Sequence, residues 1–162
     1  MSASETDPPT AQAGASSPGT GTVLPKRSDF RVFRAMGTRW MDNDVYGHVN
    51  NVVYYSYFDT AVNGWLLDAT AMDIRALPAI GVVAETSCRF LKSISFPDAL
   101  QLGLRCERLG RRSVVYGIGV FRGPETDPVA VGRFVHVYVD ALSRKAVDIP
   151  DVVRAAVQRF LV

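Results

Sequence analysis

The spacing of apolar residues changes once along this chain, and that change limits the folds open to it. Between residues 54 and 66 the spacing is three to four residues, which predicts a helix of about four turns. This apolar stripe consists of Tyr54, Phe58, Ala61, Trp65 and Leu66. Beyond Pro78 the apolar residues alternate instead, as they do in strands with one buried face. The order therefore predicts one long helix followed by a series of strands.

Turn-forming residues divide the alternating region into four parts. We expect strands over residues 80–90, 100–106, 114–120 and 129–139. On the first of them, a single face is expected to carry Ile80, Val82, Ala84, Thr86, Cys88 and Phe90. The connections are short enough for neighbouring strands to pair antiparallel, which predicts a meander.

The two ends of the domain add one element each. Residues 29–40 carry aromatics and Val with few breakers, which favours a first strand. Pro150 suits the first turn of a final short helix that covers part of the sheet. The whole pattern predicts an α+β fold whose sheet wraps around the long helix. In the last strand, Phe134 and Tyr138 lie on the face opposite to the valines, so both faces are apolar and are expected to be buried. A second subunit is the simplest way to cover the face that the helix does not cover.

Length and composition predict one domain. With 162 residues and 48% hydrophobic content, the chain can bury one substantial core. Residues 1–26 are rich in Ala, Ser, Thr, Gly and Pro and resemble neither a signal peptide nor a transit peptide, so we expect a disordered tail. The folded domain is expected over residues 27–162.

Charge and cysteine content exclude several classes of protein. The net charge of +2 is too small to predict nucleic acid as the main partner. No apolar run approaches the length of about 18 residues expected of a membrane helix. Cys88 and Cys106 fall in apolar segments rather than in a disulfide framework. We therefore expect a cytoplasmic protein.

The segment just before the long helix carries the residues best suited to chemistry. Asp42, Asp44, Gly47 and His48 stand there in quick succession, followed by Asn50 and Asn51. A carboxylate upstream of a helix start faces the positive end of the helix dipole, where free backbone amides can hold a developing oxyanion. This arrangement suits acyl transfer.

The same segment resembles a known enzyme family. Asp42-x-Asp44-x-x-Gly47, followed by an aromatic-rich helix, resembles the acyl-CoA thioesterases of the hotdog fold, particularly the 4-hydroxybenzoyl-CoA thioesterase-like group. His48-Val49-Asn50-Asn51 is also similar to a segment of the plant acyl-carrier-protein thioesterases, in which an Asp four residues before the His is catalytic. That Asp matches Asp44, whereas Tyr46 replaces an Asn of the plant enzymes, so their full catalytic network is not transferred.

The resemblance implies a hotdog fold, thioester hydrolysis, and a homodimer or homotetramer with active sites at subunit interfaces. Asp44 is the expected catalytic residue, either as a nucleophile through a mixed anhydride or as a general base toward water. Because a thiolate leaves readily, no strong general acid is required. Oxyanion donors are expected among the amides from Gly47 to Asn51 or at another helix start at the interface.

Roles for the neighbouring residues stay open at this point. His48 either orients Asp44, donates to the thioester oxygen or caps the helix. Gly47 is expected to allow a tight backbone, and Asn50 and Asn51 either cap the helix or bind the carbonyl. Tyr54 is expected in the core and in the acyl pocket.

Asp42 either shares the site as a second carboxylate or accepts structural hydrogen bonds. Glu85 and His136 are expected to be structural. Candidate cations for the CoA phosphates are Arg89, Lys92, Arg111, Arg112 and Arg133. Arg111 and Arg112 are favoured because their turn is exposed. No spacing of His or Cys suggests a metal site, and no cofactor is expected.

The leading hypothesis is therefore an acyl-CoA thioesterase that releases a free acid and CoA. The alternatives are a non-catalytic acyl-CoA-binding hotdog module and an acyl-carrier-protein thioesterase. Hydration or dehydration of an enoyl thioester ranks last, because the chain has no His-Phe-Pro loop.

Overall fold

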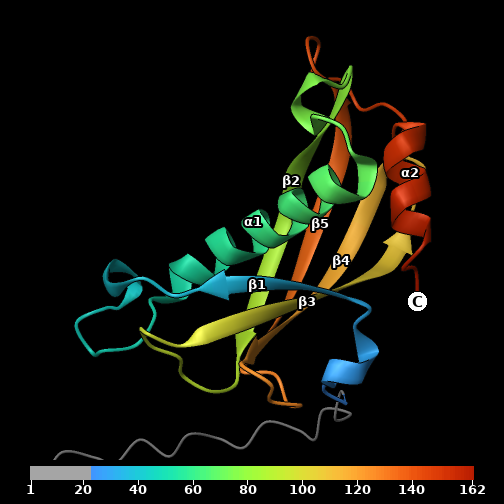
Figure 1. Ribbon diagram of the computed structural model, residues 1–162. Coiled ribbons are helices and arrows are strands. Elements are labelled where there is room, and N and C mark those ends of the chain that lie inside the picture. The colour runs from blue at the N-terminus through green and yellow to red at the C-terminus, as the bar shows by residue number, and fades with distance from the viewer. Residues whose placement is uncertain (1–22) are drawn as a thin grey trace, which may run out of the picture.

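A long helix lies across one face of an antiparallel sheet in the computed structural model, which describes residues 23–162 (Figure 1). The strands of this sheet are β1 (Val32–Gly37), β2 (Ala79–Phe90), β3 (Ala99–Leu109), β4 (Ser113–Arg122) and β5 (Ala130–Asp140). Their spatial order is β1-β3-β4-β5-β2, and every neighbouring pair is antiparallel. Helix α1 (Asn51–Thr70) follows β1, and helix α2 (Asp151–Gln158) ends the domain. The hotdog architecture is confirmed.

Helix α1 begins where the sequence supplies a capping side chain. The Oδ1 atom of Asn50 accepts a hydrogen bond from the backbone N–H of Val52 at 3.2 Å. The helix runs for 20 residues and ends at Ala71, whose φ of 52° lies in the left-handed region. It is longer than the predicted four turns because the apolar stripe marks only its buried middle. Its last turn is held partly by Thr70, whose hydroxyl donates to the Leu66 carbonyl at 2.7 Å.

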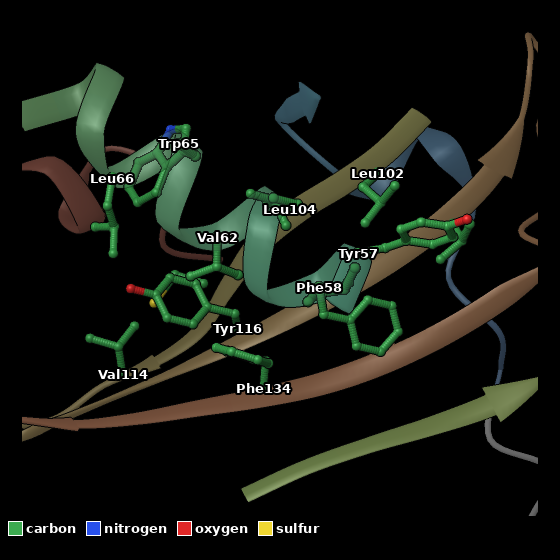
Figure 2. Close-up of a cluster of buried hydrophobic side chains, with 14 of the residues drawn as sticks. Tyr57, Phe58, Val62, Trp65, Leu66, Leu102, Leu104, Val114, Tyr116 and Phe134 are labelled. Atoms are coloured by element: carbon green, nitrogen blue, oxygen red, sulfur yellow. The ribbon is translucent and has the colours of Figure 1, made fainter. Parts of the chain in front are cut away.

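The apolar stripe of α1 forms the core with the concave face of the sheet (Figure 2). Phe58, Val62 and Leu66 have at most 2% of their surface exposed. The opposing side chains shown there are Leu102, Leu104, Val114, Tyr116 and Phe134. Burying a side chain such as Phe58 contributes about 1.5–3 kcal/mol, so the stripe fixes α1 on the sheet.

A glycine lets the helix approach β5 closely. A Cβ atom built on Gly132 would lie 2.4 Å from the Phe58 ring, so any larger residue there would displace the ring. The position of Gly132 thus helps to set the depth of α1 above the sheet.

The prediction of one continuous apolar face on β2 is wrong. The register with β5 shifts between Val83 and Glu85, which reverses the alternation in mid-strand. Gly81 and Val83 share a face with Thr86, Cys88 and Phe90, because these residues pair with the even-numbered residues of β5. A bulge cannot be recognised from the alternation of apolar and polar residues in the sequence.

The other strands lie close to the predicted ranges, but the predicted meander holds only for β3, β4 and β5, because β2 pairs with β5 and not with β3, which pairs with β1 instead. β1 covers only the middle of residues 29–40, because 3-10 helices η1 (Arg27–Asp29) and η2 (Trp40–Asp42) flank it. The predicted face of α2 is buried, and Phe160 beyond it packs on Trp65 with ring centroids 4.3 Å apart. A third 3-10 helix, η3 (Ile74–Ala76), leads from α1 into β2. The predicted tail, residues 1–26, lies mostly outside the described residues.

None of the helices within residues 23–162 has the length and apolar character needed to cross a bilayer.

Candidate active site

Asp44 lies in a tight loop that its own carboxylate helps to hold. Its Oδ1 atom accepts hydrogen bonds from the backbone N–H groups of Tyr46 at 2.8 Å and His48 at 3.4 Å. The Asp44 N–H donates to the His48 carbonyl at 2.8 Å, which closes the loop. Gly47 has a φ of +81°, a conformation that other residues rarely adopt. The Asp44 Oδ2 atom has no hydrogen-bond partner within residues 23–162.

A second segment, residues 91–98, supports this loop from the end of β2. The Val49 N–H donates to the Ile94 carbonyl at 2.8 Å. The Phe96 N–H donates to the Asn43 side chain at 3.1 Å. These two bonds link the start of α1 to the carboxyl end of β2, although the two segments are about 50 residues apart in sequence.

A cavity of about 350 Å³ opens between these two segments. It is lined by Asp44, His48, Val49, Asn51, Tyr54, Phe90, Leu91, Lys92 and Ser93. Tyr54 is buried and meets Phe90 edge to face, with ring centroids 4.9 Å apart, so the inner wall is aromatic. Burial raises the pKa of Tyr54 to about 12, which keeps its hydroxyl neutral. The cavity therefore combines a carboxylate, an imidazole and an ammonium group with an apolar wall.

Most of the expected oxyanion donors are already occupied. The N–H groups of Gly47, His48, Val49 and Asn50 each donate to an oxygen of the protein. The Asn51 N–H, at the first residue of α1, has no acceptor among the residues described. Among the backbone N–H groups from Gly47 to Asn51, it is therefore the one free to bind an oxyanion at the positive end of the helix dipole.

Of the two alternatives for Asp42, the contacts favour the acceptor of structural hydrogen bonds. Only 1% of its surface is exposed, and it accepts hydrogen bonds from Tyr57 Oη at 2.6 Å, Arg39 N at 2.8 Å and Arg39 Nε at 3.0 Å. Burial by itself raises the pKa of Asp42, but these hydrogen bonds outweigh it and hold the pKa below its usual value. Asp42 is the last residue of a 3-10 turn, Trp40–Asp42, that begins directly after Arg39.

The structure brings together some of the predicted site residues and leaves others apart. Asp44, His48, Asn51 and Tyr54 line the cavity, and Gly47 shapes the loop behind it. Asn50 caps α1 and does not line the cavity. The His48 imidazole makes no hydrogen bond to the Asp44 carboxylate.

Arg111 and Arg112 lie far from Asp44 within the protomer. Both pair with Asp148, with nitrogen-to-oxygen distances of 2.9 and 3.4 Å. Their turn contacts α2, since Arg154 donates to the Arg111 carbonyl at 2.9 Å. Helix α2 lies at the opposite end of α1 from the Asp44 loop (Figure 1). The favoured phosphate-binding turn is thus not part of this cavity.

Two of the other candidate cations lie on β-strands. Arg133 forms a cross-strand ion pair with Glu85, in keeping with a structural role for Glu85. Arg89 is exposed on β2. Lys92 is the candidate cation that lines the Asp44 cavity.

Sequence reasoning missed the wall formed by Phe90, Leu91 and Ser93. Phe90 ends an alternating segment, and nothing in that spacing places it beside a loop more than 40 residues earlier. Its 45% exposure is unusual for such a residue and is visible only in the folded chain. Among residues 23–162, no three His, Cys, Asp or Glu side chains are grouped as metal ligands would be.

Comparison with known proteins agrees with this geometry. The family model of the thioesterase-like superfamily matches residues 38–157. The crystal structure of the PA5185 protein from Pseudomonas aeruginosa strain PAO1 is 42% identical, with a TM-score of 0.82 over 85% of this chain and 96% of that chain.

Two further proteins are more distant. The uncharacterized protein YsmA of Bacillus subtilis (strain 168) is 25% identical over 126 residues, which are 77% of this chain and 84% of YsmA. Slr0204, a 1,4-dihydroxy-2-naphthoyl-CoA thioesterase from Synechocystis, shares the fold at 15% identity, with a TM-score of 0.71 over 78% of this chain and 94% of that chain. With most of the domain matched by the family model, the chain belongs to the thioesterase-like superfamily, and the expected hotdog-fold thioester hydrolase is confirmed.

Proposed function

We propose that this protein hydrolyses an acyl-CoA thioester to a free acid and CoA, and that Asp44 is the reacting carboxylate. The observation that carries the proposal is the unequal use of the two Asp44 oxygens. Oδ1 is held by two backbone amides, while Oδ2 has no partner within residues 23–162. A carboxylate held in this way at the wall of a cavity is oriented before the substrate arrives, which lowers the entropic cost of reaction.

Two mechanisms use this carboxylate. As a nucleophile, Oδ2 forms a bond to the thioester carbon, the carbon–sulfur bond breaks, and CoA leaves as a thiolate; water then hydrolyses the mixed anhydride. As a general base, Oδ2 takes a proton from water, whose oxygen attacks the same carbon and expels the thiolate. In both mechanisms the carbonyl oxygen becomes an oxyanion, and the Asn51 N–H is the candidate donor for it.

His48 is a candidate for positioning the thioester substrate, and not for orienting the Asp44 carboxylate. His48 lines the cavity, yet its imidazole makes no hydrogen bond to the Asp44 carboxylate. A hydrogen bond from the imidazole to the thioester oxygen would add to that from Asn51. In this proposal Asp44 carries out the reaction, and His48 only helps to position the substrate.

Lys92 is the proposed phosphate contact within the protomer. It is exposed at the cavity rim and has no ion pair within the described part of the chain. Replacing Lys92 with Ala should raise the KM for an acyl-CoA about three- to fivefold and leave kcat unchanged, because an exposed ion contact is worth at most about 1 kcal/mol. The effect should vanish with the matching acyl-pantetheine, which lacks the nucleotide phosphates. A larger increase of KM in Arg111→Ala than in Lys92→Ala would instead place the CoA phosphates at the turn of residues 111–112.

A panel assay tests the proposed function directly. The full chain is incubated with CoA esters that carry short, long, branched and aromatic acyl groups, and with acyl-carrier-protein esters, while a thiol-reactive dye reports release. Turnover of CoA esters is expected. Tight binding without thiol release would favour the non-catalytic acyl-CoA-binding module. Turnover restricted to the carrier-protein esters would favour the acyl-carrier-protein thioesterase.

The free edge of β2 supports a homodimer as the working form. β2 is 12 residues long and lies at the edge of the sheet, where its outer backbone groups have no strand partner in the protomer. A long exposed edge is a template for pairing with another chain. Two copies related by a two-fold axis can join these edges antiparallel and form one continuous sheet.

A further inference from the structure

A smaller cavity adjoins the Asp44 cavity, where Leu91 and Lys92 line both. It has a volume of about 190 Å³ and is called the Lys26 cavity below. Its other walls come from the start of the described chain and from the turn between β4 and β5, and consist of Leu24, Pro25, Lys26, Asp127 and Pro128. The reaction proposed for Asp44 makes no use of this space.

Backbone hydrogen bonds hold the three segments around this cavity together. The Arg27 N–H donates to the Thr126 carbonyl at 2.9 Å, which fixes the first segment on the β4–β5 turn. The N–H groups of Leu91 and Lys92 both donate to the Val129 carbonyl at 2.9 Å, which fixes the segment after β2 on the same turn. The cavity is therefore formed before a ligand binds, which lowers the cost of ordering its walls.

The wall formed by residues 24–26 lies outside the part of the chain that the family shares. These residues precede the matched region of the thioesterase-like superfamily, residues 38–157. The Arg27 guanidinium anchors them, because it donates to the carbonyls of Gly123 at 3.1 Å and Glu125 at 3.3 Å. It also lies over the Phe121 ring, 5.3 Å from the centroid. This chain thus adds a wall of its own beside the common site.

Two ammonium groups and one carboxylate give the Lys26 cavity a positive charge. The Lys26 Nζ atom donates to Asp127 Oδ1 at 2.5 Å, and more than half of each side chain is exposed. Because an ammonium group has three N–H donors, two remain for an anion. Lys26, and to a smaller extent Lys92, hold the pKa of the Asp127 carboxyl below its usual value, so both cations lie near this carboxylate.

The rest of the wall is apolar. Leu24, Pro25 and Leu91 are half-buried, and Pro128 is buried. The volume lies below the range of about 300–1,000 Å³ typical of a complete small-molecule site. The cavity therefore suits one ring system with a negative charge at its edge, which is one end of a larger ligand.

We propose that the Lys26 cavity binds the nucleotide end of CoA while the thioester lies at Asp44, with the adenine on the apolar wall, the 3′-phosphate at Lys26 and the 5′-pyrophosphate at Lys92. This inference rests on the proposed function and assigns CoA as the carrier of the acyl group. The order of the contacts follows from CoA itself, in which the pyrophosphate lies between the sulfur and the 3′-phosphate. Lys92 lines both cavities, whereas Lys26 does not line the Asp44 cavity. A carrier-protein ester has no adenosine to place there.

Two esters of the same acyl group test the contact at Lys26. Thiol release is measured for the acyl-CoA and for its 3′-dephospho-CoA ester. Lys26→Ala should raise the KM for acyl-CoA about three- to fivefold, the usual size of an exposed ion contact, and should leave kcat and the KM for the dephospho ester unchanged. Lys92→Ala should raise both KM values, since both esters keep the pyrophosphate. An unchanged KM in Lys26→Ala, or an equal increase for both esters, would overturn the proposal.

Asp127 supplies a variant with the opposite expected effect. Asp127→Asn removes a negative charge beside the phosphate and frees Lys26, so the KM for acyl-CoA should fall about twofold to threefold. If the ion pair only supported the fold, Lys26→Ala and Asp127→Asn would change KM in the same direction, which would contradict the proposal. Lys145→Ala is the matched control and should behave as wild type, because this exposed lysine lies beyond the other end of β5 and lines neither cavity.

Binding without turnover separates this inference from the proposed function. Adenosine 3′,5′-bisphosphate carries the adenine and the 3′-phosphate of CoA but no thioester, and isothermal titration calorimetry measures its Kd. Lys26→Ala should weaken this binding about three- to fivefold. The same binding in a chain that hydrolyses no ester would refute the proposed function and retain the nucleotide site. Hydrolysis of acyl-CoA with no binding of the bisphosphate, or with equal Kd in wild type and Lys26→Ala, would refute only the nucleotide site.

Discussion

Replacing Asp44 with Asn is expected to lower kcat/KM for acyl-CoA hydrolysis by about 100-fold to 10,000-fold, the usual contribution of a general base and a lower bound for a nucleophile. Asn has nearly the same shape, and its Oδ1 atom can still accept from the N–H groups of Tyr46 and His48. The loop is thus retained while the reactive carboxylate is lost. Thiol release under kcat/KM conditions, together with circular dichroism of both proteins, measures this effect.

Asp140 provides the matched control for this substitution. Its Oδ1 atom also accepts from two backbone amides, those of Leu142 at 3.2 Å and Ser143 at 2.7 Å, but Asp140 is the last residue of β5 and does not line the Asp44 cavity. Asp140→Asn should therefore hydrolyse at the wild-type rate. If Asp44→Asn and Asp140→Asn behaved alike, Asp44 would be a turn-forming residue with no chemical role.

The fold was predictable because its main elements have strong periodicity. The stripe from Tyr54 to Leu66 and the alternation in β3 and β4 each involve many residues, so local exceptions do not hide them. The bulge near Ala84 was not predictable, because an extra residue in a strand can be recognised only from the way the strand pairs with its neighbour. The helix length was underestimated for a related reason, since its polar ends carry no apolar signal.

The site was only partly predictable from local sequence. Asp44, Gly47, His48 and Asn51 are near neighbours in the chain, so one loop brings them together. Phe90 and Lys92 complete the cavity through long-range contacts that no local pattern encodes. A further cavity of about 270 Å³, at the other end of α1, is lined by residues of α1, η3, β2, β5 and α2, so it too appears only after folding.

Replacing Asp42 with Asn is expected to lower the free energy of unfolding by about 2–3 kcal/mol, because hydrogen bonds to a charged group contribute about 1.5–3 kcal/mol each and an amide cannot accept all of them. The affected donors are Tyr57 Oη and two nitrogens of Arg39. The Asp42 carbonyl also accepts from the Asn50 N–H at 2.8 Å, so the change reaches the start of α1. Urea unfolding at pH 7 measures the stability, and thiol release should show a reduced kcat.

Three further measurements test whether the loss of the buried carboxylate causes the lower stability of Asp42→Asn. Tyr57→Phe should cost about 1.5–3 kcal/mol, and the double variant with Asp42→Asn should cost less than the sum, because both remove the same bond to the charged carboxylate. Asp148→Asn, which removes an exposed carboxylate that pairs with two arginines, should leave the unfolding curve unchanged. The pKa of Asp42 is depressed in the folded state, so its stabilising effect is present above pH 3.8 and is lost as the pH falls through the folded pKa. Equal stability of Asp42→Asn and wild type at pH 7 would show that this network does not hold the loop in place.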